Sequence, residues 1–283
     1  AINSQNLYSP EFYAGFEGYD SRTYLDENLI QRWVKGDSIS VFTSTHNQKY
    51  KFNGETGDNS GTFSVVPTSQ TTQGGNLAVD ANFAVYPYNE NITVKPDGTI
   101  SLELPSYQRY VKNSFDASVN HMVAMTGSRR DTDLRFRNLC GYLRLRLYGD
   151  DVTISSLYLY SNNGEKISGQ AIVNPASDSE LPLTMTENAS GHIYLDCGEG
   201  VKIGTTADEA TDFWFIVAPV FLEAGFQINI NDNLGGYDWL ATWNQLRVER
   251  NVIESMEPIE VKPNGVYVER DTYYVGTEGG YVD

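Results

Sequence analysis

The sequence predicts an all-β protein built from two tandem β-sandwich domains. Its 283 residues include 19 Tyr, 12 Phe and 25 Gly, a composition that favours pleated strands and tight turns over helices. Short runs of alternating or wholly apolar residues recur between turn clusters at intervals of roughly 8 to 15 residues, which is typical of sandwich folds. The length suits two domains of about 140 residues each.

The first half of the chain contains a regular series of strand-like runs. Residues 49–52 and 61–65 flank turn residues that begin at Asn53-Gly54, so we expect them to form a hairpin. Pro87 and Pro105 end two other runs, because proline cannot continue a strand ladder. Strands are therefore expected at 38–42, 49–52, 61–65, 82–86, 91–94, 99–104 and 122–125.

A polar, charged stretch between Thr126 and Asp133 follows these strands and marks the predicted domain boundary. We expect an N-terminal domain at 1–132 and a C-terminal domain at 133–283. The second domain ends in a C-terminal strand extension at about 258–283. It contains turn residues at Pro263-Asn264-Gly265 between two extended runs.

The second half shows the same strand pattern. In residues 141–148 Leu alternates with Arg, which indicates one buried and one solvent-exposed face. We expect hairpins from 152–160 with 166–172 and from 225–231 with 239–243, and the apolar run 213–220 predicts a central strand because it lacks alternation. Helical patterns are short and limited to 108–117 and 207–211.

The charge of the chain excludes several classes of partner. Twenty Lys and Arg against 37 Asp and Glu give a formal net charge of −17. Nucleic-acid binding depends on basic residues that neutralise phosphates, so we expect no nucleic-acid partner. The sequence has no apolar run approaching the roughly 18 residues of a membrane-spanning helix, so we expect a chain that is not transmembrane.

The sequence offers no catalytic, metal or cofactor motif, and we expect a protein that is not an enzyme. Asp131 and Asp133 have no matching partner nearby and are interpreted as solvent-exposed carboxylates. The oxygen-rich residues 229–233 could bind calcium, but their place between two strands favours a turn. We expect Cys140 and Cys197 to be buried thiols, although spacing alone leaves a disulfide open.

The abundant Tyr and Trp residues allow two interpretations. Aromatic residues in strands usually belong to the core or to cross-strand pairs. The alternative is an exposed platform that binds glycans.

An ordered set of segments resembles the fimbrillin-like surface proteins of Bacteroidales, a family that includes pilins and pilus-associated lipoproteins. No segment is specific alone, but their order and spacing between residues 12 and 255 are similar to that family. The segments are 33–42 (Trp33-Val34-Lys35-Gly36-Asp37 and the following strand), 83–88 (Phe83-Ala84-Val85-Tyr86-Pro87-Tyr88), Leu104-Pro105 with Gln108, Met122-Val123-Ala124, 134–141 with 143–145, and 215–230.

The resemblance implies two domains of transthyretin-like topology and export to the outer membrane as a lipoprotein precursor. It also implies a cell-surface role in fimbriae that mediate adhesion to a host or bacterial surface protein or glycan. The expected partners are other fimbrial subunits or copies of the chain itself, joined by β-strand complementation, in which an added strand pairs an open sheet edge. The alternative function is a surface lipoprotein that binds glycans through exposed aromatic residues.

Two sets of residues are candidates for assembly. Cleavage between Arg22 and Thr23 corresponds to the trimming of an N-terminal strand that polymerising relatives undergo, although an exposed loop explains this Arg equally well. The C-terminal extension is either a donor strand for a neighbouring subunit or a segment that folds back onto its own domain. Its strand-forming residues are Val266, Tyr267, Val268, Tyr273, Tyr274 and Val275.

Overall fold

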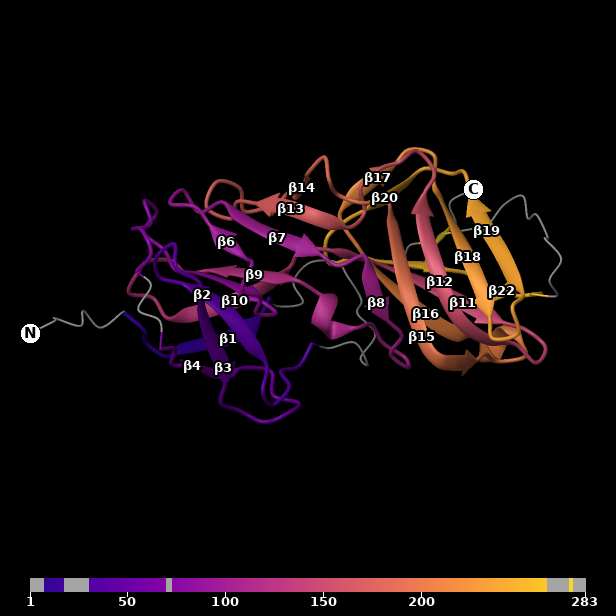
Figure 1. The fold of residues 1–283 in the computed structure, drawn as a ribbon, viewed down its shortest axis with the longest axis horizontal. Helices are drawn as coiled ribbons and strands as arrows, with labels where there is room; N and C mark the ends of the chain where they lie inside the picture. The colour runs from indigo at the N-terminus through magenta and orange to yellow at the C-terminus, as the bar shows by residue number, and fades with distance from the viewer. Residues whose placement is uncertain (1–7, 18–30, 70–72, 264–274, 277–283) are drawn as a thin grey trace, which may run out of the picture. The chain divides into compact units, whose positions relative to one another are not determined.

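A computed structural model describes residues 8–17, 31–69, 73–263 and 275–276, and these residues are almost entirely strand and loop. The chain folds into two compact units. Unit 1 comprises Ala1–Glu103, Asn120–Leu139 and Ala171–Thr184, and unit 2 comprises Leu104–Val119, Cys140–Gln170 and Met185–Asp283. The expected all-β class is confirmed (Figure 1). Within the described ranges, no helix is long and apolar enough to cross a membrane.

The division into units differs from the expected boundary between residues 132 and 133. Strand β10 (Asp133–Asn138) pairs with β1 (Phe12–Phe16) and with β9 (Met122–Met125), so it belongs to unit 1. Strand β8 (Tyr107–Arg109) instead pairs with β15 (His192–Lys202) of unit 2. The pairings of β1 with β10 and of β8 with β15 join segments that are distant in sequence, which local patterns do not reveal.

Seven strands of unit 1 form a closed barrel rather than the two separate sheets of a sandwich. The remaining members are β2 (Ser38–Phe42), β3 (Gln48–Phe52), β4 (Gly61–Val65) and β5 (Phe83–Tyr86). The barrel closes because β1 pairs antiparallel with β4 on one side and parallel with β10 on the other. The expected hairpin of 49–52 with 61–65 is confirmed, since β3 and β4 are antiparallel neighbours.

Trp33 lies at the centre of the barrel core and is 1% exposed. Its indole stacks on Phe16 at 4.5 Å between ring centroids and meets Phe63 edge-on at 4.9 Å. The indole Nε1 donates a hydrogen bond to the backbone oxygen of Ala14 at 3.2 Å. This bond satisfies the polar atom of the ring, as buried Trp residues require.

A four-stranded sheet has the order β14-β13-β7-β6. Its strands are β6 (Thr93–Val94), β7 (Ile100–Leu104), β13 (Gly169–Val173) and β14 (Thr184–Met185). The predicted hairpin of 152–160 with 166–172 is therefore wrong, because β13 pairs with β7 and β14. Strand β12 (Thr153–Ser161) pairs instead with β15 and β18 (Phe226–Asp232).

Unit 2 is a β-sandwich of two five-stranded sheets. One has the order β16 (Thr211–Val217), β11 (Gly141–Tyr148), β21 (Ile253–Met256), β23 (Val275–Gly276), with β22 (Ile259–Glu260) also on β11. The other has the order β19 (Tyr237–Thr242), β18, β12, β15, β8, and Figure 1 shows these strands side by side. The expected hairpin of 225–231 with 239–243 is confirmed as β18 and β19.

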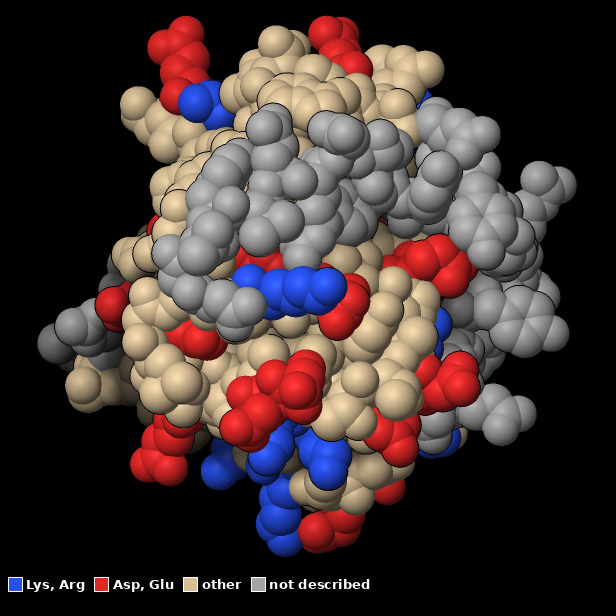
Figure 2. Space-filling model, turned by 90° about the vertical axis from the view of Figure 1, so that its right-hand side faces the viewer, with Lys and Arg blue, Asp and Glu red and all other residues tan. Residues whose placement is uncertain are grey.

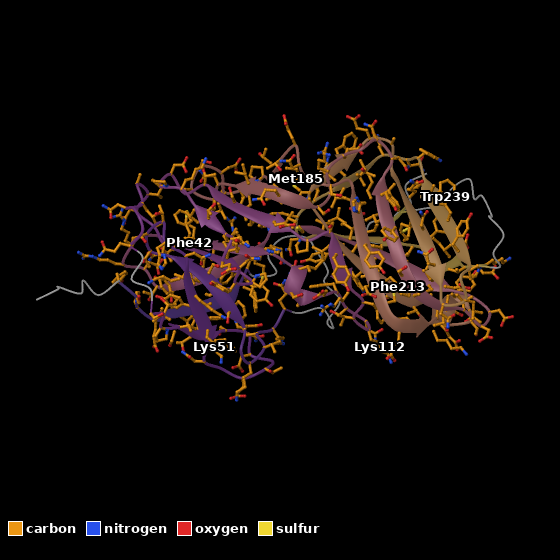
Figure 3. All side chains as sticks on the ribbon, viewed as in Figure 1. Phe42, Lys51, Lys112, Met185, Phe213 and Trp239 are labelled. Atoms are coloured by element: carbon orange, nitrogen blue, oxygen red, sulfur yellow. The ribbon has the colours of Figure 1, made fainter. Side chains whose placement is uncertain are left out.

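The two sheets of unit 2 enclose one apolar core, to which both contribute alternate residues. From one sheet come Leu145 and Phe213, and from the other Leu159 and Ile228. Figure 3 labels Phe213 on β16, where it is fully buried. Burial of one face of each sheet is the arrangement that the Leu and Arg alternation in 141–148 predicts.

The run 213–220 is not a central strand. Strand β16 ends at Val217 and pairs only with β11, and β17 (Val220–Leu222) pairs with β20 (Leu246–Val248). The outer side of β16 is nevertheless covered, because Phe115 contacts the Trp214 ring at 6.4 Å between centroids. This cover explains why the sequence shows no alternation there. The helical pattern expected at 108–117 is wrong, because residues 108 and 109 belong to β8 and the 3₁₀ turn η2 (Ala117–Val119) begins only at its last residue. The pattern expected at 207–211 is a single 3₁₀ turn, η3 (Ala207–Glu209).

Candidate functional site

The outer face of the β19-β18-β12-β15-β8 sheet carries a group of aromatic and amide side chains. Along β12, Leu157 and Leu159 are buried, whereas Tyr158 and Tyr160 point away from the core and are partly exposed. Strand β15 repeats the pattern, with Tyr194 between the buried Ile193 and Leu195. We name this surface the tyrosine face, made of Tyr107, Arg109, Tyr158, Tyr160, His192, Tyr194, Asp196, Gln227, Asn229 and Trp239.

The register of the strands places one residue from each in a straight row. Tyr107 is opposite Tyr194, Tyr194 is opposite Tyr158, and the row continues through β18 to β19. Directly opposed side chains lie about 5 Å apart, so they form a continuous surface. The row, in order from β8 to β19, is Tyr107, Tyr194, Tyr158, Asn229 and Trp239.

The aromatic rings of this face contact one another in sequence. The Tyr158 and Tyr194 ring centroids are 4.6 Å apart, and those of Tyr107 and Tyr194 are 5.7 Å apart. Tyr158 and Tyr160 are nearly parallel, at 15° and 5.9 Å. His192 extends the group at 6.2 Å from Tyr160. Such mutual contact fixes the rings and lowers the entropy that a ligand must remove on binding.

Some polar atoms of the tyrosine face form hydrogen bonds with other described residues, and others do not. The hydroxyl of Tyr107 donates a hydrogen bond to the Asp196 carboxylate. The indole Nε1 of Trp239 donates to Oε1 of Gln227 at 2.9 Å. The hydroxyls of Tyr158, Tyr160 and Tyr194 form no hydrogen bond with any described residue. These three hydroxyls are therefore available to a ligand.

The charges on this face are few and balanced. The hydrogen bond between Tyr107 and Asp196 raises the pKa of the phenol and lowers the pKa of the carboxyl, so Asp196 is ionised at neutral pH. The Arg109 guanidinium carbon lies 6.0 Å from the Tyr107 ring centroid. Apart from His192, the ionisable groups at this point of the tyrosine face are thus one carboxylate and one guanidinium.

Most of the residues predicted to act in assembly lie outside the described residues. These are Arg22, Thr23, Val266, Tyr267, Val268, Tyr273 and Tyr274. Val275 is described and pairs with Met256 of β21 in the chain's own sheet. Val275 is thus the predicted assembly residue that lies within the described residues.

The residues considered for a calcium site and for a disulfide are both described by the structure. Asp232 accepts hydrogen bonds from the backbone nitrogens of Leu234 and Gly236, so it closes the β18–β19 turn as the turn interpretation expects. Cys140 and Cys197 are free, buried thiols, and burial raises the pKa of each to about 12. In the described part of the chain, no group of three or more His, Cys, Asp and Glu side chains could hold a metal ion.

A small cavity in the core of unit 2 contains one unusual carboxyl group. Glu254 on β21 lines this cavity beside Ser161 and otherwise apolar side chains such as Leu159 and Phe226. Glu254 is 4% exposed, and its Oε2 has no hydrogen-bond partner in the described residues. Burial, and secondarily the charge of Glu249, raise the pKa of Glu254 to about 7. No second acid and no histidine is among the lining residues, and the Ser161 hydroxyl donates a hydrogen bond to the backbone oxygen of Glu165 at 2.7 Å.

The sequence predicts only part of the tyrosine face. The alternation in Leu157-Tyr158-Leu159-Tyr160 indicates tyrosines on the outer side of one strand. The proximity of Tyr107 to this group follows from the pairing of β8 with β15, across 85 or more residues of sequence, and no local signal encodes it.

The fold is shared with solved structures, although neither a protein-family model nor a curated protein matches the chain. A "putative cell adhesion protein" from Bacteroides ovatus matches with a TM-score of 0.56 and 13% identity over 94% of each chain. One with the same description from Bacteroides uniformis matches with a TM-score of 0.54 and 16% identity, over 95% of this chain and 97% of that chain.

A third structure is the tip fimbrial protein Mfa3 from Porphyromonas gingivalis, with a TM-score of 0.39 and 11% identity over 90% of this chain and 96% of that chain. The two structures with the higher TM-scores are both described as cell adhesion proteins of Bacteroides. The first two show that the chain has the fold of the adhesion proteins.

Proposed function

We propose that this protein is a non-catalytic, fimbria-associated adhesion protein of the cell surface. The observation that carries the proposal is the fold that it shares, over nearly its whole length, with the Bacteroides ovatus protein described as an adhesion protein. The ordered segments that resemble fimbrillin-like proteins support the same function. The tyrosine face adds a surface suited to binding, because clustered Tyr and Trp side chains supply large contact areas at low entropic cost.

The family resemblance supports four finer parts of this proposal. They are transthyretin-like topology in two domains, export as a lipoprotein precursor to the outer membrane, cleavage between Arg22 and Thr23, and assembly with fimbrial subunits or copies of itself. Assembly would occur by β-strand complementation, with the C-terminal extension as the donor. Strand β23 pairs at one end of a unit 2 sheet, a position that a strand from a neighbouring subunit could also occupy.

Fractionation of the cells that produce the protein tests its location. Surface appendages are sheared off, purified and probed with an antibody against the protein. We expect the protein to copurify with the appendages, and recovery only from the cytoplasmic fraction would contradict the proposal. The intact mass of the recovered protein then reports lipidation, and an N-terminus at Thr23 identifies cleavage after Arg22.

Electron microscopy of the purified full chain tests complementation. We expect rods from the wild type and none from a Val275→Pro variant, because proline removes a backbone donor and disrupts strand pairing. A Lys112→Ala variant, changed at an exposed site of unit 2, is the matched control and should form rods. Absence of wild-type rods, or rods that persist in Val275→Pro, would contradict assembly through this strand.

A further inference from the structure

We propose that the tyrosine face binds an uncharged glycan. The inference rests on the proposed adhesion function and names the ligand class of its binding surface. Three observations carry it: the continuous row of rings, the free hydroxyl and amide groups among them, and the near absence of charge.

The rings supply flat apolar area to which a sugar can bind. A pyranose ring presents C–H groups on one face, and these pack on the electron-rich face of an aromatic ring. Tyr194 lies between Tyr107 and Tyr158 at 5.7 and 4.6 Å between centroids. Three rings in contact across three strands therefore extend over more than one sugar unit, which suits an oligosaccharide better than a monosaccharide.

The polar groups supply the hydrogen bonds that a sugar needs. Sugar hydroxyls both donate and accept, and phenol hydroxyls and side-chain amides do the same. The hydroxyls of Tyr158, Tyr160 and Tyr194 are free among the described residues, and so is the side-chain amide of Asn229 between Tyr158 and Trp239. The polar groups thus lie beside the rings, where they can bind hydroxyl groups at the edge of a stacked sugar.

The charge of this face selects an uncharged ligand. The chain carries a net charge of −17, which repels sialylated, sulfated and uronic glycans at long range. Arg109 has the ionised Asp196 beside it through Tyr107, so this pair offers no excess positive charge to an anion. A neutral glycan avoids both costs.

Core packing does not require these tyrosines. One face of the sheet is buried in the sandwich, and the outer face of an antiparallel sheet can carry ordinary polar residues. Tyr107 remains 47% exposed, and Tyr158, Tyr160 and Tyr194 are partly exposed. Cross-strand pairing accounts for some stabilisation, but not for the partly exposed rings with free hydroxyls that lie together on β12 and β15.

A glycan array probed with the full chain tests the inference. The array carries neutral oligosaccharides of glucose, galactose, mannose and N-acetylglucosamine together with sialylated and sulfated counterparts. We expect binding to neutral members, confirmed by calorimetry with the strongest neutral oligosaccharide. The affinity should change by less than about two-fold between 0.05 and 0.5 M salt, because no charge pair is involved.

Matched variants then assign the binding to the tyrosine face. Tyr158→Ala and Tyr194→Ala should each weaken binding at least about ten-fold, and Tyr158→Phe should weaken it less because the ring remains. Tyr13→Ala is the control, since Tyr13 is a 50% exposed tyrosine of unit 1 whose hydroxyl meets Ser60 Oγ at 2.6 Å. Circular dichroism checks the fold of each variant. Asn229→Ala replaces any alanine variant that fails to fold.

Each remaining outcome overturns the inference. It fails if the array shows no binding, if only sialylated or sulfated glycans bind, or if Tyr158→Ala and Asn229→Ala bind like the wild type. Failure of the proposed function is seen separately, in the fractionation of producing cells. A protein that copurifies with surface appendages but binds no glycan would retain the proposed function and lose only this inference.

Discussion

Glu254 is an acidic residue whose environment in the folded protein differs strongly from that in the unfolded chain. Its pKa is about 7 in the folded protein against 4.5 for an ordinary Glu, since burial disfavours the charged carboxylate. A raised acid pKa means that the folded state binds the proton more tightly than the unfolded state. Glu254 therefore favours folding most at low pH, and this advantage is lost as the pH rises from about 4.5 to about 7.

Replacement of Glu254 by Gln should therefore stabilise the protein at pH 8, by on the order of 2 kcal/mol. The gain should vanish near pH 4, where the wild-type carboxyl is already protonated. Urea unfolding between pH 4 and pH 8 measures both values. Glu103→Gln, at an exposed site in unit 1, is the control and should leave the pH dependence unchanged. A Glu254→Gln variant that is less stable than the wild type at pH 8 would contradict the claim that burial disfavours the ionised Glu254 carboxylate.

At the level of single residues, the sequence predicted burial better than exposure. The apolar surroundings of Cys140 and Cys197 correctly indicated buried thiols. For the partly exposed tyrosines, the sequence left two interpretations open: residues of the core or of cross-strand pairs, and an exposed platform that binds glycans. Their contacts with Tyr107 depend on tertiary pairing, which no local pattern encodes.

The edge of strand β16 shows how single residues protect an element. Gln108 is 2% exposed, and its side-chain amide makes two bonds to Ile216. Its Nε2 donates to the Ile216 oxygen at 2.8 Å, and its Oε1 accepts from the Ile216 nitrogen at 3.0 Å. The amide thus replaces a neighbouring strand at this point and prevents the edge from pairing with another chain.

Replacement of Gln108 by Ala should destabilise unit 2 by about 2 kcal/mol, because it leaves two buried backbone groups of Ile216 unpaired. Thermal and urea unfolding of the full chain measure the loss. Lys112→Ala, in the same segment and exposed, should change stability by less than about 0.5 kcal/mol. Equal stability of Gln108→Ala and the wild type would show that the amide does not protect this edge.

At the scale of elements, the existence of strands was predictable and their partners were not. The alternation in 141–148 and the turn between 231 and 239 identified β11 and the β18–β19 hairpin, since both signals are local. The hairpin expected after β12 was wrong because β13 leaves to pair with β7. Core packing decides which distant strands pair. The residue pattern of a single strand shows which face is buried but does not identify its partner.

Each of the two units is built from segments that are separated in the sequence. Unit 1 needs β10 and residues 171–184 in addition to its N-terminal segments, and unit 2 needs β8. A fragment of residues 1–132 lacks β10, so its barrel has no partner for β1 and β9 on that side. We expect this fragment to be unfolded by NMR, whereas the full chain is folded. A dispersed amide spectrum from the fragment would contradict the described division.

The net charge of −17 comes from 37 acidic side chains against 20 basic ones. Figure 2 shows one end of the molecule, where Asp and Glu side chains are dispersed with Lys and Arg among them. Dispersed negative charge keeps a protein soluble and limits nonspecific binding to anionic surfaces. On the tyrosine face the Asp196 and Arg109 charges balance, so a neutral ligand can approach it.

Adhesion of producing cells tests whether this protein has an adhesion function. A strain without the protein and strains complemented with the wild type, the Tyr13→Ala variant or the Tyr158→Ala variant are compared for attachment to a surface that the wild-type strain colonises. We predict that attachment falls on deletion and returns with the wild type and Tyr13→Ala, but returns much less with Tyr158→Ala. Attachment of the deletion strain at the wild-type level would contradict an adhesion function for this protein.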